Sequence, residues 1–297
     1  MEFYWDFIDE DSKKVRTFLI EQGVSHRMFS KIKHQGGEIK INGKNAFTSD
    51  FLKKGDRIMI KMPPEEENEI LLPDYEPIDI IYEDKHWLLV NKPFGINTVP
   101  GSADRLHTLV NKVKGHLINE NAPSLVPHVV TRLDRDTSGI VLLAKHKFAH
   151  AVLDEQLQKH EIKKFYTALV SGDIQEDHGI IEKAIGRVDN DFIRREVRED
   201  GKYSKTEYWV VERFKSFTQL KIQLHTGRTH QIRVHFSYLG HPLIGDELYG
   251  GPNSSLINRQ ALNANEIEFF DPFANKKQHF VLALPYDIKN IINQKKF

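Results

Sequence analysis

The densest group of polar side chains lies at residues 131–139, whose sequence is TRLDRDTSG. Apolar, strand-like runs flank it on both sides, so we expect a tight loop at the end of a buried strand. Loops held by a rigid scaffold often carry functional groups. The guanidinium groups of Arg132 and Arg135 favour the ionised form of the Asp134 carboxylate, which suits a nucleophile. On these residues alone, a surface loop stabilised by ion pairs is the simpler interpretation.

Two further clusters combine cations with groups that can hold a nucleotide. HTGRTHQIR at 225–233 joins a predicted strand to the start of a predicted helix. Helix N-termini attract anions, and the Arg228 guanidinium can hold a carboxylate or phosphate with two hydrogen bonds. KKFY at 163–166 places bases beside aromatic rings, which suits stacking on an unpaired base next to a phosphate chain. A pair of aromatic rings in the core explains that segment equally well.

Several kinds of chemistry are disfavoured by what the sequence lacks. There is no cysteine, which excludes disulfides, thiolate metal sites and cysteine nucleophiles. Glycine-rich phosphate loops and the zinc-protease and serine-hydrolase motifs are also absent. The histidines at 225, 230, 235 and 241 are not spaced i, i+4 on one helix face, so packing or RNA contact is the better interpretation. We therefore expect neither a metal nor a cofactor.

Length and composition are those of a two-domain globular protein. The chain has 297 residues, of which 39% are hydrophobic and 28% charged. The first residues are acidic and lack a long apolar run, and no stretch approaches the roughly 18 apolar residues of a membrane span. The expected location is the cytoplasm, without attachment to a membrane.

Charge is distributed unevenly although the formal net charge is zero. Residues 12–62 hold twelve Lys or Arg against four Asp or Glu, a net charge of +8. Residues 1–11 carry −5 and residues 63–79 carry −7, with no Lys or Arg in either. This pattern predicts a nucleic-acid-binding module at 12–62, an acidic linker at 63–79 and a second domain at 80–297. A lysine-rich soluble surface is the alternative.

The basic segment is predicted to form two short helices packed on a small sheet. Gly23 follows a run with helical spacing, and Ser25 can cap a second helix that buries Phe29 and Ile32. Asn42-Gly43 is a strong hairpin signal. The cations of the second helix suit contact with RNA phosphates, and they are Arg27, Lys31 and Lys33. This order of elements, with GVSHR at 23–27 and IKING at 39–43, resembles the small RNA-binding domain of ribosomal protein S4.

Beyond residue 80, strands and helices alternate without a regular repeat. Strands are predicted at 87–90, 126–131, 140–144, 163–170, 206–211 and 217–224, and helices at 146–159 and from 229 to 240. This irregular order predicts an α+β fold with a mixed, mainly antiparallel sheet flanked by helices.

Taken together, the polar clusters resemble the signature of the RluA-type family of pseudouridine synthases. The matching segments are RLDRDTSG at 132–139, YED to NKPFG at 82–95, KFYTALV at 164–170, and TGRTHQIR to GHPLIGD at 226–246. The resemblance covers nearly all of 80–297, and an S4-like domain precedes it in one branch of that family. Thr131 departs from the pattern, because the family usually has histidine there. We expect this change to alter loop hydrogen bonds rather than the chemistry.

The resemblance implies isomerisation of uridine in RNA. The bond from the sugar to the ring nitrogen breaks, the uracil rotates, and carbon 5 joins the same sugar carbon, for which the base must leave its stack. Asp134 is then the essential carboxylate, as nucleophile or as base, with Arg228 as its counter-ion. Tyr166 stacks on the uracil and Ile232 lines its other side. Arg132 fills the gap left by the base or holds a phosphate.

The resemblance also bears on partners. Large-subunit ribosomal RNA is the favoured substrate, transfer RNA is the second option, and the chain is expected to act as a monomer. Two other functions stay open, namely a base-excising hydrolase and a non-catalytic RNA-binding or ribosome-assembly factor. The presence of both Asp134 and Tyr166 favours the isomerase over the non-catalytic factor.

Overall fold

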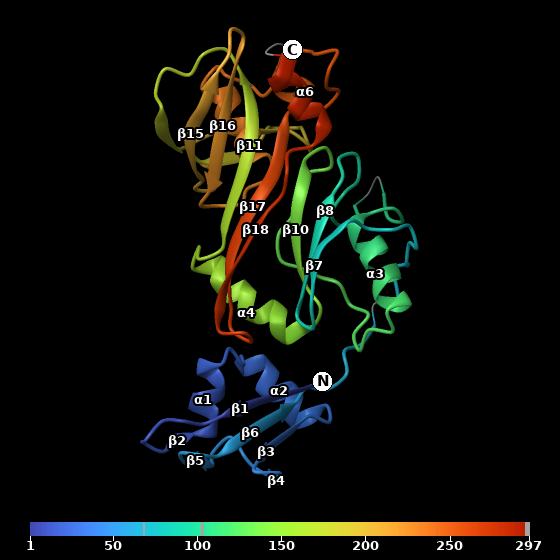
Figure 1. The fold of residues 1–297 in the computed structure, drawn as a ribbon, viewed down its shortest axis with the longest axis vertical. Helices are drawn as coiled ribbons and strands as arrows, with labels where there is room; N and C mark the ends of the chain where they lie inside the picture. Colours follow the sequence, from blue (N-terminus) through green and yellow to red (C-terminus); the bar gives the residue numbers. More distant parts are fainter. Residues whose placement is uncertain (68, 102–103, 295–297) are drawn as a thin grey trace.

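The computed structural model describes residues 1–67, 69–101 and 104–294. They form a small N-terminal domain and a long C-terminal domain, stacked along the longest axis of the molecule (Figure 1). No helix among these residues is long and apolar enough to cross a membrane.

The N-terminal domain is a four-stranded antiparallel sheet covered by two helices. The strand order is β1 (Glu2–Asp6), β6 (Arg57–Lys61), β3 (Glu38–Ile41) and β4 (Lys44–Asn45), while β2 (Lys13–Lys14) pairs with β5 (Phe51–Leu52). The helices are α1 (Val15–Glu21) and α2 (His26–His34). Both predicted helices and the predicted hairpin are therefore present.

Local signals explain these elements. Ser25 Oγ accepts a hydrogen bond from the backbone N–H of Met28 and so caps α2 (3.4 Å). Asn42 and Gly43 adopt φ angles of 50° and 81°, as a tight two-residue hairpin requires. One detail of the prediction is wrong: Met28 is buried more deeply than Phe29, because the buried face of α2 is rotated by one residue.

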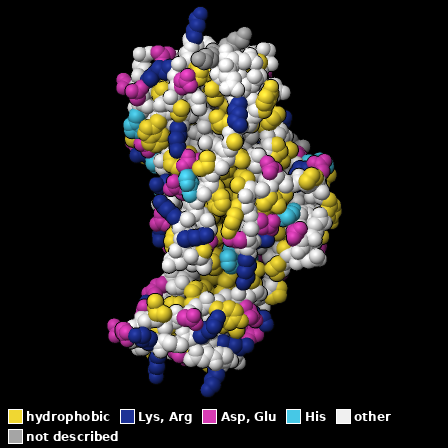
Figure 2. Space-filling view, viewed as in Figure 1, with side chains coloured by type: hydrophobic (Ala, Val, Ile, Leu, Met, Phe, Trp, Pro, Cys, Tyr) yellow, Lys and Arg dark blue, Asp and Glu magenta, His cyan; other side chains and the backbone are white. Residues whose placement is uncertain are grey.

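The predicted domain start at residue 12 is wrong, because the acidic segment before it belongs to the sheet. β1 pairs with β6 from Glu2 opposite Lys61 to Asp6 opposite Arg57. The side chain of Phe3, within β1, is buried. Counted over 1–62, the domain has a net charge of +3 rather than +8. Acidic and basic side chains are interspersed over its visible face (Figure 2).

A ten-stranded sheet forms the C-terminal domain. Its order is β12 (His178–Glu182), β15 (Lys205–Arg213), β16 (Phe217–Leu224), β11 (Lys163–Ser171), β17 (Leu262–Asp271), β10 (Ser138–Ala144), β8 (Trp87–Lys92) and β7 (Ile80–Glu83), with β18 (Lys276–Val281) beside β17 and β9 (His128–Val129) beside β10. Within the described part of this sheet, β10 and β17 run parallel and the other pairs are antiparallel. The α+β prediction is thus confirmed, although the strand predicted at 126–131 is reduced to β9.

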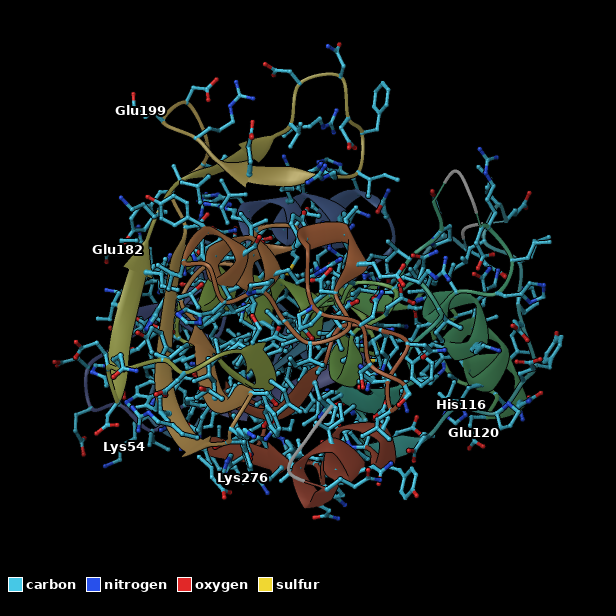
Figure 3. The ribbon with its side chains drawn as sticks, turned by 90° about the horizontal axis from the view of Figure 1, so that it is seen from above. Lys54, His116, Glu120, Glu182, Glu199 and Lys276 are labelled. Carbon is cyan, nitrogen blue, oxygen red and sulfur yellow. The ribbon has the colours of Figure 1, made fainter. Side chains whose placement is uncertain are left out.

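Helices and one hairpin surround this sheet. They are α3 (Leu109–Asn119), α4 (Lys147–Gln158), α5 (Gln231–Tyr238), a short 3-10 helix (Glu247–Tyr249), α6 (Tyr286–Gln294), and the hairpin of β13 (Ile185–Arg187) and β14 (Arg195–Val197). α4 lies at the end nearest the N-terminal domain and α6 at the far end (Figure 1). Seen from above, α3 with His116 and Glu120 lies on the opposite side of the domain from β12 with Glu182 (Figure 3).

The composition of the segment 63–79 predicted a solvated linker, but among its described residues several carboxylates pair with α3. The side chains of Lys112 and Lys114 are 9% and 4% exposed, and their ammonium groups lie 3.1 Å from Asp74 and 2.7 Å from Glu67. Buried cations without partners are strongly destabilising, so the acidic segment is held where it neutralises them.

The two domains share one hydrophobic cluster. The Phe3 ring packs edge-on against Phe148 of α4, with ring centroids 4.9 Å apart, and 5.8 Å from the ring of Phe273. Gly23 fits this contact because a Cβ there would lie 2.7 Å from Val152 Cγ2, and its φ of +87° favours glycine. The N-terminal domain is therefore packed against α4 in a defined orientation.

Candidate active site

Asp134 lies in the loop between β9 and β10, and backbone bonds hold the loop on both sides of it. The Thr98 hydroxyl donates to the Leu133 carbonyl (2.8 Å) and accepts from the Leu133 N–H (3.1 Å). The buried Lys92 ammonium donates to the Arg135 carbonyl (3.0 Å), and burial lowers the pKa of Lys92 to about 7. The Asp134 backbone is thus positioned before any substrate enters.

The Thr-Ser-Gly sequence at 137–139 joins this loop to the sheet. Gly139 has a φ of +117°, and a Cβ there would lie 2.1 Å from the carbonyl oxygen of Ala264. Only glycine permits this close approach of the parallel strands β10 and β17. Thr137 Oγ1 accepts a hydrogen bond from the Gln260 amide (3.1 Å), which also ties the loop to the start of β17.

A cleft of about 610 Å³ opens beside Asp134. Its walls come from the loop before β10, from β11, and from the segment that joins β16 to α5. It gathers all the site residues that the sequence predicted for the C-terminal domain: Arg132, Asp134, Tyr166, Arg228 and Ile232. Segments about 100 residues apart in sequence therefore meet around one cavity.

The counter-ion of Asp134 is Arg233, and the prediction of Arg228 in that role is wrong. Arg233 Nη1 lies 3.7 Å from Asp134 Oδ2. Arg228 Nε instead donates to the backbone carbonyl of Tyr203 (3.1 Å). The physical reason is that Arg233 lies inside α5 on the side that faces the loop, whereas Arg228 precedes the helix.

Arg233 is oriented by a second carboxylate. Its Nε and Nη2 donate to the two oxygens of Asp246 at 2.7 and 2.8 Å, which leaves Nη1 toward Asp134. Burial by itself would lower the pKa of Arg233, but the hydrogen bonds and charge of Asp246 outweigh it and raise that pKa. A planar guanidinium can satisfy both carboxylates in one fixed geometry.

His230 also lies at the site, although the sequence predicted it only as a packing or RNA-contacting histidine. Its Nε2 lies 3.9 Å from Asp134 Oδ2, and its Nδ1 lies 2.8 Å from the Tyr249 hydroxyl. Burial lowers the pKa of His230. Its φ of 58° is unusual for a residue other than glycine, and such conformations cluster at functional sites. No sequence signal indicated this conformation.

An aromatic and an aliphatic side chain face the same cleft. Tyr166 and Ile232 are 6% and 3% exposed. Burial and the charge of Asp134 raise the pKa of the Tyr166 hydroxyl, which therefore stays protonated at neutral pH. Arg132 is exposed at the edge of the cleft. These surfaces suit a flat base held between a ring and an aliphatic chain.

Thr131 contributes a hydrogen bond within the loop. Its buried hydroxyl accepts from the backbone N–H of Leu142 in β10 (2.9 Å). That Thr131 leaves the chemistry unchanged stays a prediction.

The predicted RNA-binding cations of α2 lie on two sides of the helix. Arg27 and Lys31, one turn apart, approach Lys147 at the start of α4, and contact with Lys31 lowers the pKa of Lys147. The nearby carboxylate of Glu65 acts in the opposite direction and raises the pKa of Lys147. Lys33 is exposed on a different side of α2. Cations from both domains thus meet at the domain junction.

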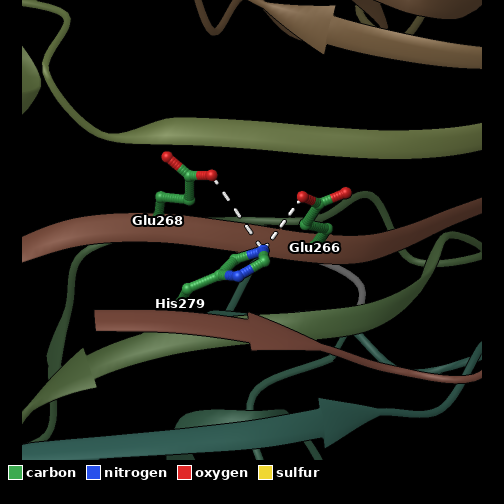
Figure 4. Close-up of side chains that lie close together, drawn as sticks. All are labelled: Glu266, Glu268 and His279. Carbon is green, nitrogen blue, oxygen red and sulfur yellow. Dashed lines mark hydrogen bonds and ion pairs between the residues drawn. The ribbon is translucent and has the colours of Figure 1, made fainter. Parts of the chain in front are cut away.

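One cluster in the described part of the chain has the residue types of a metal site. Glu266 and Glu268 of β17 lie beside His279 of β18, whose Nε2 is 3.0 and 4.0 Å from their carboxylates (Figure 4). Lys221 lies 2.7 Å from Glu266, and Lys163 lies 3.6 Å from Glu268. Because lysines already neutralise these carboxylates, we interpret the cluster as a surface ion network outside the cleft.

Comparisons with known proteins agree with this geometry. The family model described as RNA pseudouridylate synthase matches residues 86–238. YjbO of Bacillus subtilis, named as an uncharacterized RNA pseudouridine synthase, is 40% identical over 94% of this chain and 98% of that protein. The ribosomal large subunit pseudouridine synthase D of Pseudomonas aeruginosa is 34% identical over 84% of this chain and 82% of its own length.

Solved structures support the same assignment. Human RNA pseudouridylate synthase domain containing 1 is 25% identical, with a TM-score of 0.55 over 75% of this chain and 96% of that chain. Human RNA pseudouridylate synthase domain containing 4, at 19% identity and a TM-score of 0.61 over 73% of this chain and 92% of that chain, shares the fold. The chain therefore belongs to the RluA-type family of RNA pseudouridine synthases, which are isomerases, as its motifs predicted.

Proposed function

We propose that this protein converts a specific uridine of large-subunit ribosomal RNA to pseudouridine, with Asp134 as the essential carboxylate. One observation carries the proposal: the Asp134 carboxylate lies 3.7 Å from a buried guanidinium at a cleft that Tyr166 lines. Relatives named ribosomal large subunit pseudouridine synthase D, at 33–35% identity, support the substrate class.

In the proposed mechanism, a uridine leaves its stack and enters the cleft with its base against Tyr166 and Ile232. Asp134 acts in its ionised form, either by attack on the sugar carbon or by removal of a sugar proton, and Arg233 stabilises that form. The bond from ring nitrogen 1 to the sugar breaks and the bond from carbon 5 forms. The proton of carbon 5 is lost and nitrogen 1 gains one, so no atom is added overall.

The two alternatives predict different products. A base-excising hydrolase releases free uracil and leaves an abasic sugar, whereas the isomerase leaves the mass of the RNA unchanged. A non-catalytic RNA-binding factor leaves uridine as it is. Mass spectrometry of the RNA and of the released small molecules separates the three.

The target is tested by mapping pseudouridines in total RNA from cells without the gene, and from the same cells complemented with wild-type protein or with Asp134→Asn. We expect one or a few uridines of large-subunit ribosomal RNA to lose the modification, and only the wild-type protein to restore it. Loss confined to transfer RNA would overturn the ribosomal substrate. Unchanged pseudouridine in all RNA would overturn the proposed function.

We also propose that the N-terminal domain is an S4-like RNA-binding module and that the protein acts as a cytoplasmic monomer. Support for RNA binding comes from Arg27, Lys31 and Lys147, which place like charges together at the domain junction. An RNA phosphate there would relieve their mutual repulsion.

We expect Arg27→Gln/Lys31→Gln to weaken RNA binding at moderate salt and to reduce the log–log salt slope by about 0.7–0.9 for each phosphate that the variant no longer neutralises. The rate at saturating RNA should persist, because neither residue lines the cleft. A salt titration of binding measures the effect, with the exposed Lys53→Gln as a matched control. Substitution is preferable to deleting residues 1–75, because the deletion would remove Asp74, one of two carboxylate partners of Lys112, and Glu67, which pairs with Lys114. An unchanged slope would contradict the RNA-binding role.

A further inference from the structure

Lys164 is a cation of the cleft that has no anionic partner in the part of the chain that the structure describes. It lines the cleft two residues before Tyr166 on β11, so both side chains point to the same face of the sheet, about 6.6 Å apart along the strand. Burial lowers the pKa of Lys164. The neighbouring Lys163 points to the opposite face, where it lies 3.6 Å from Glu268.

The more deeply buried lysines of this domain all have partners in the described part of the chain. The Lys92 ammonium donates to three backbone carbonyls at 2.8–3.0 Å. Lys112 and Lys114 pair with carboxylates of the segment 63–79. Lys164 is half-buried. An ammonium that is partly removed from water is costly unless it is paired, so an unpaired one in a cleft indicates that an anion completes the site.

The surroundings of Lys164 leave room for that anion. A Cβ at Gly227 would lie 3.7 Å from Lys164 Nζ and would meet no other neighbouring atom within 4 Å. The ammonium therefore faces open space between β11 and the segment that precedes α5. A larger residue at 227 would fill part of that space.

We infer that Lys164 binds a phosphate of the RNA backbone next to the target nucleotide, an inference that rests on the proposed function. A base seated against Tyr166 carries its sugar and flanking phosphates with it. A phosphate is thus the anion that the substrate itself brings close to Lys164, which lies two residues from Tyr166 on β11. Phosphate contacts fix the register of a nucleic acid on a protein, so Lys164 holds the nucleotide in place while the uracil rotates.

The first test uses the full chain and a stem-loop RNA that carries the mapped uridine. Lys164→Gln should raise KM about 10- to 100-fold, as expected for loss of one charge-assisted hydrogen bond, and leave kcat unchanged. Its salt slope of binding should fall by about 0.7–0.9. Lys164→Arg should restore most of the affinity. Lys163→Gln, which alters the adjacent residue on the opposite face, should match the wild type.

A second measurement identifies the phosphate. Single phosphates on either side of the target are made neutral by methylphosphonate substitution. Wild-type protein should lose affinity at one position, and Lys164→Gln should show no further loss there.

Equal losses in both proteins, or a lower kcat with unchanged KM and salt slope, would overturn the inference. If thermal unfolding shows that Lys164→Gln is not folded, the same measurements are made with Lys164→Met, and the methylphosphonate series is read with the wild-type protein. If the wild-type protein tolerates every neutral linkage equally, the inference is overturned. Failure of the wild-type protein to form pseudouridine overturns the proposed function instead.

Discussion

Asp134→Asn is expected to bind its RNA nearly as tightly as the wild type and to form no measurable pseudouridine. Aspartate and asparagine side chains have nearly the same shape, and the hydrogen bonds from Thr98 and Lys92 to the loop backbone are unaffected by the change. The amide, however, can neither attack a carbon nor accept a proton as a carboxylate does. A loss of about 10³-fold or more in single-turnover rate is expected.

Single-turnover conversion and RNA binding measured on the same preparation decide this prediction. Asp136→Asn is the matched control, because Asp136 lies in the same loop, pairs with Arg135 (3.3 Å) and does not line the cleft. The control variant should keep the wild-type rate. A rate above a few per cent of wild type for Asp134→Asn would remove Asp134 from the chemistry.

Arg233→Lys is expected to be far more damaging than Arg228→Lys. The Arg233 guanidinium holds Asp246 with two nitrogen atoms and presents a third to Asp134. A lysine keeps the charge but cannot serve both carboxylates in one plane, so the Asp134 carboxylate loses its orientation. A displacement of about 1 Å in an active site costs about 10²-fold in rate. Arg228 loses only its bond to the Tyr203 carbonyl.

The measurement is kcat at saturating RNA for both variants, together with their thermal unfolding. Arg233→Lys should show a lower kcat even where the protein is fully folded. If Arg228→Lys is the more damaging variant under these conditions, Arg228 acts on Asp134 during the reaction, as the sequence alone suggested.

Features that depend on short-range pattern were predictable from the sequence. The strand at 217–224 has the predicted bounds, and the helix predicted at 146–159 is observed at Lys147–Gln158. Gly23 has the positive φ expected after a helix, and Asn42-Gly43 forms the expected hairpin. Residues of three polar clusters, at 131–139, 163–166 and 225–233, line one cleft. Each of these signals is contained within about 15 residues, where periodicity and turn chemistry act directly.

The remaining features depend on contacts between distant segments. The parallel pairing of β10 with β17 and the docking of α5 place Arg233 rather than Arg228 at Asp134. Both arginines belong to one motif, and the packing of α5 against the loop selects Arg233 for the ion pair. In the same way, the acidic segment 63–79 looked like a solvated linker until buried lysines on α3 supplied its partners. A sequence shows which charges a protein has, but their partners are chosen by burial and distance, which only the tertiary structure determines.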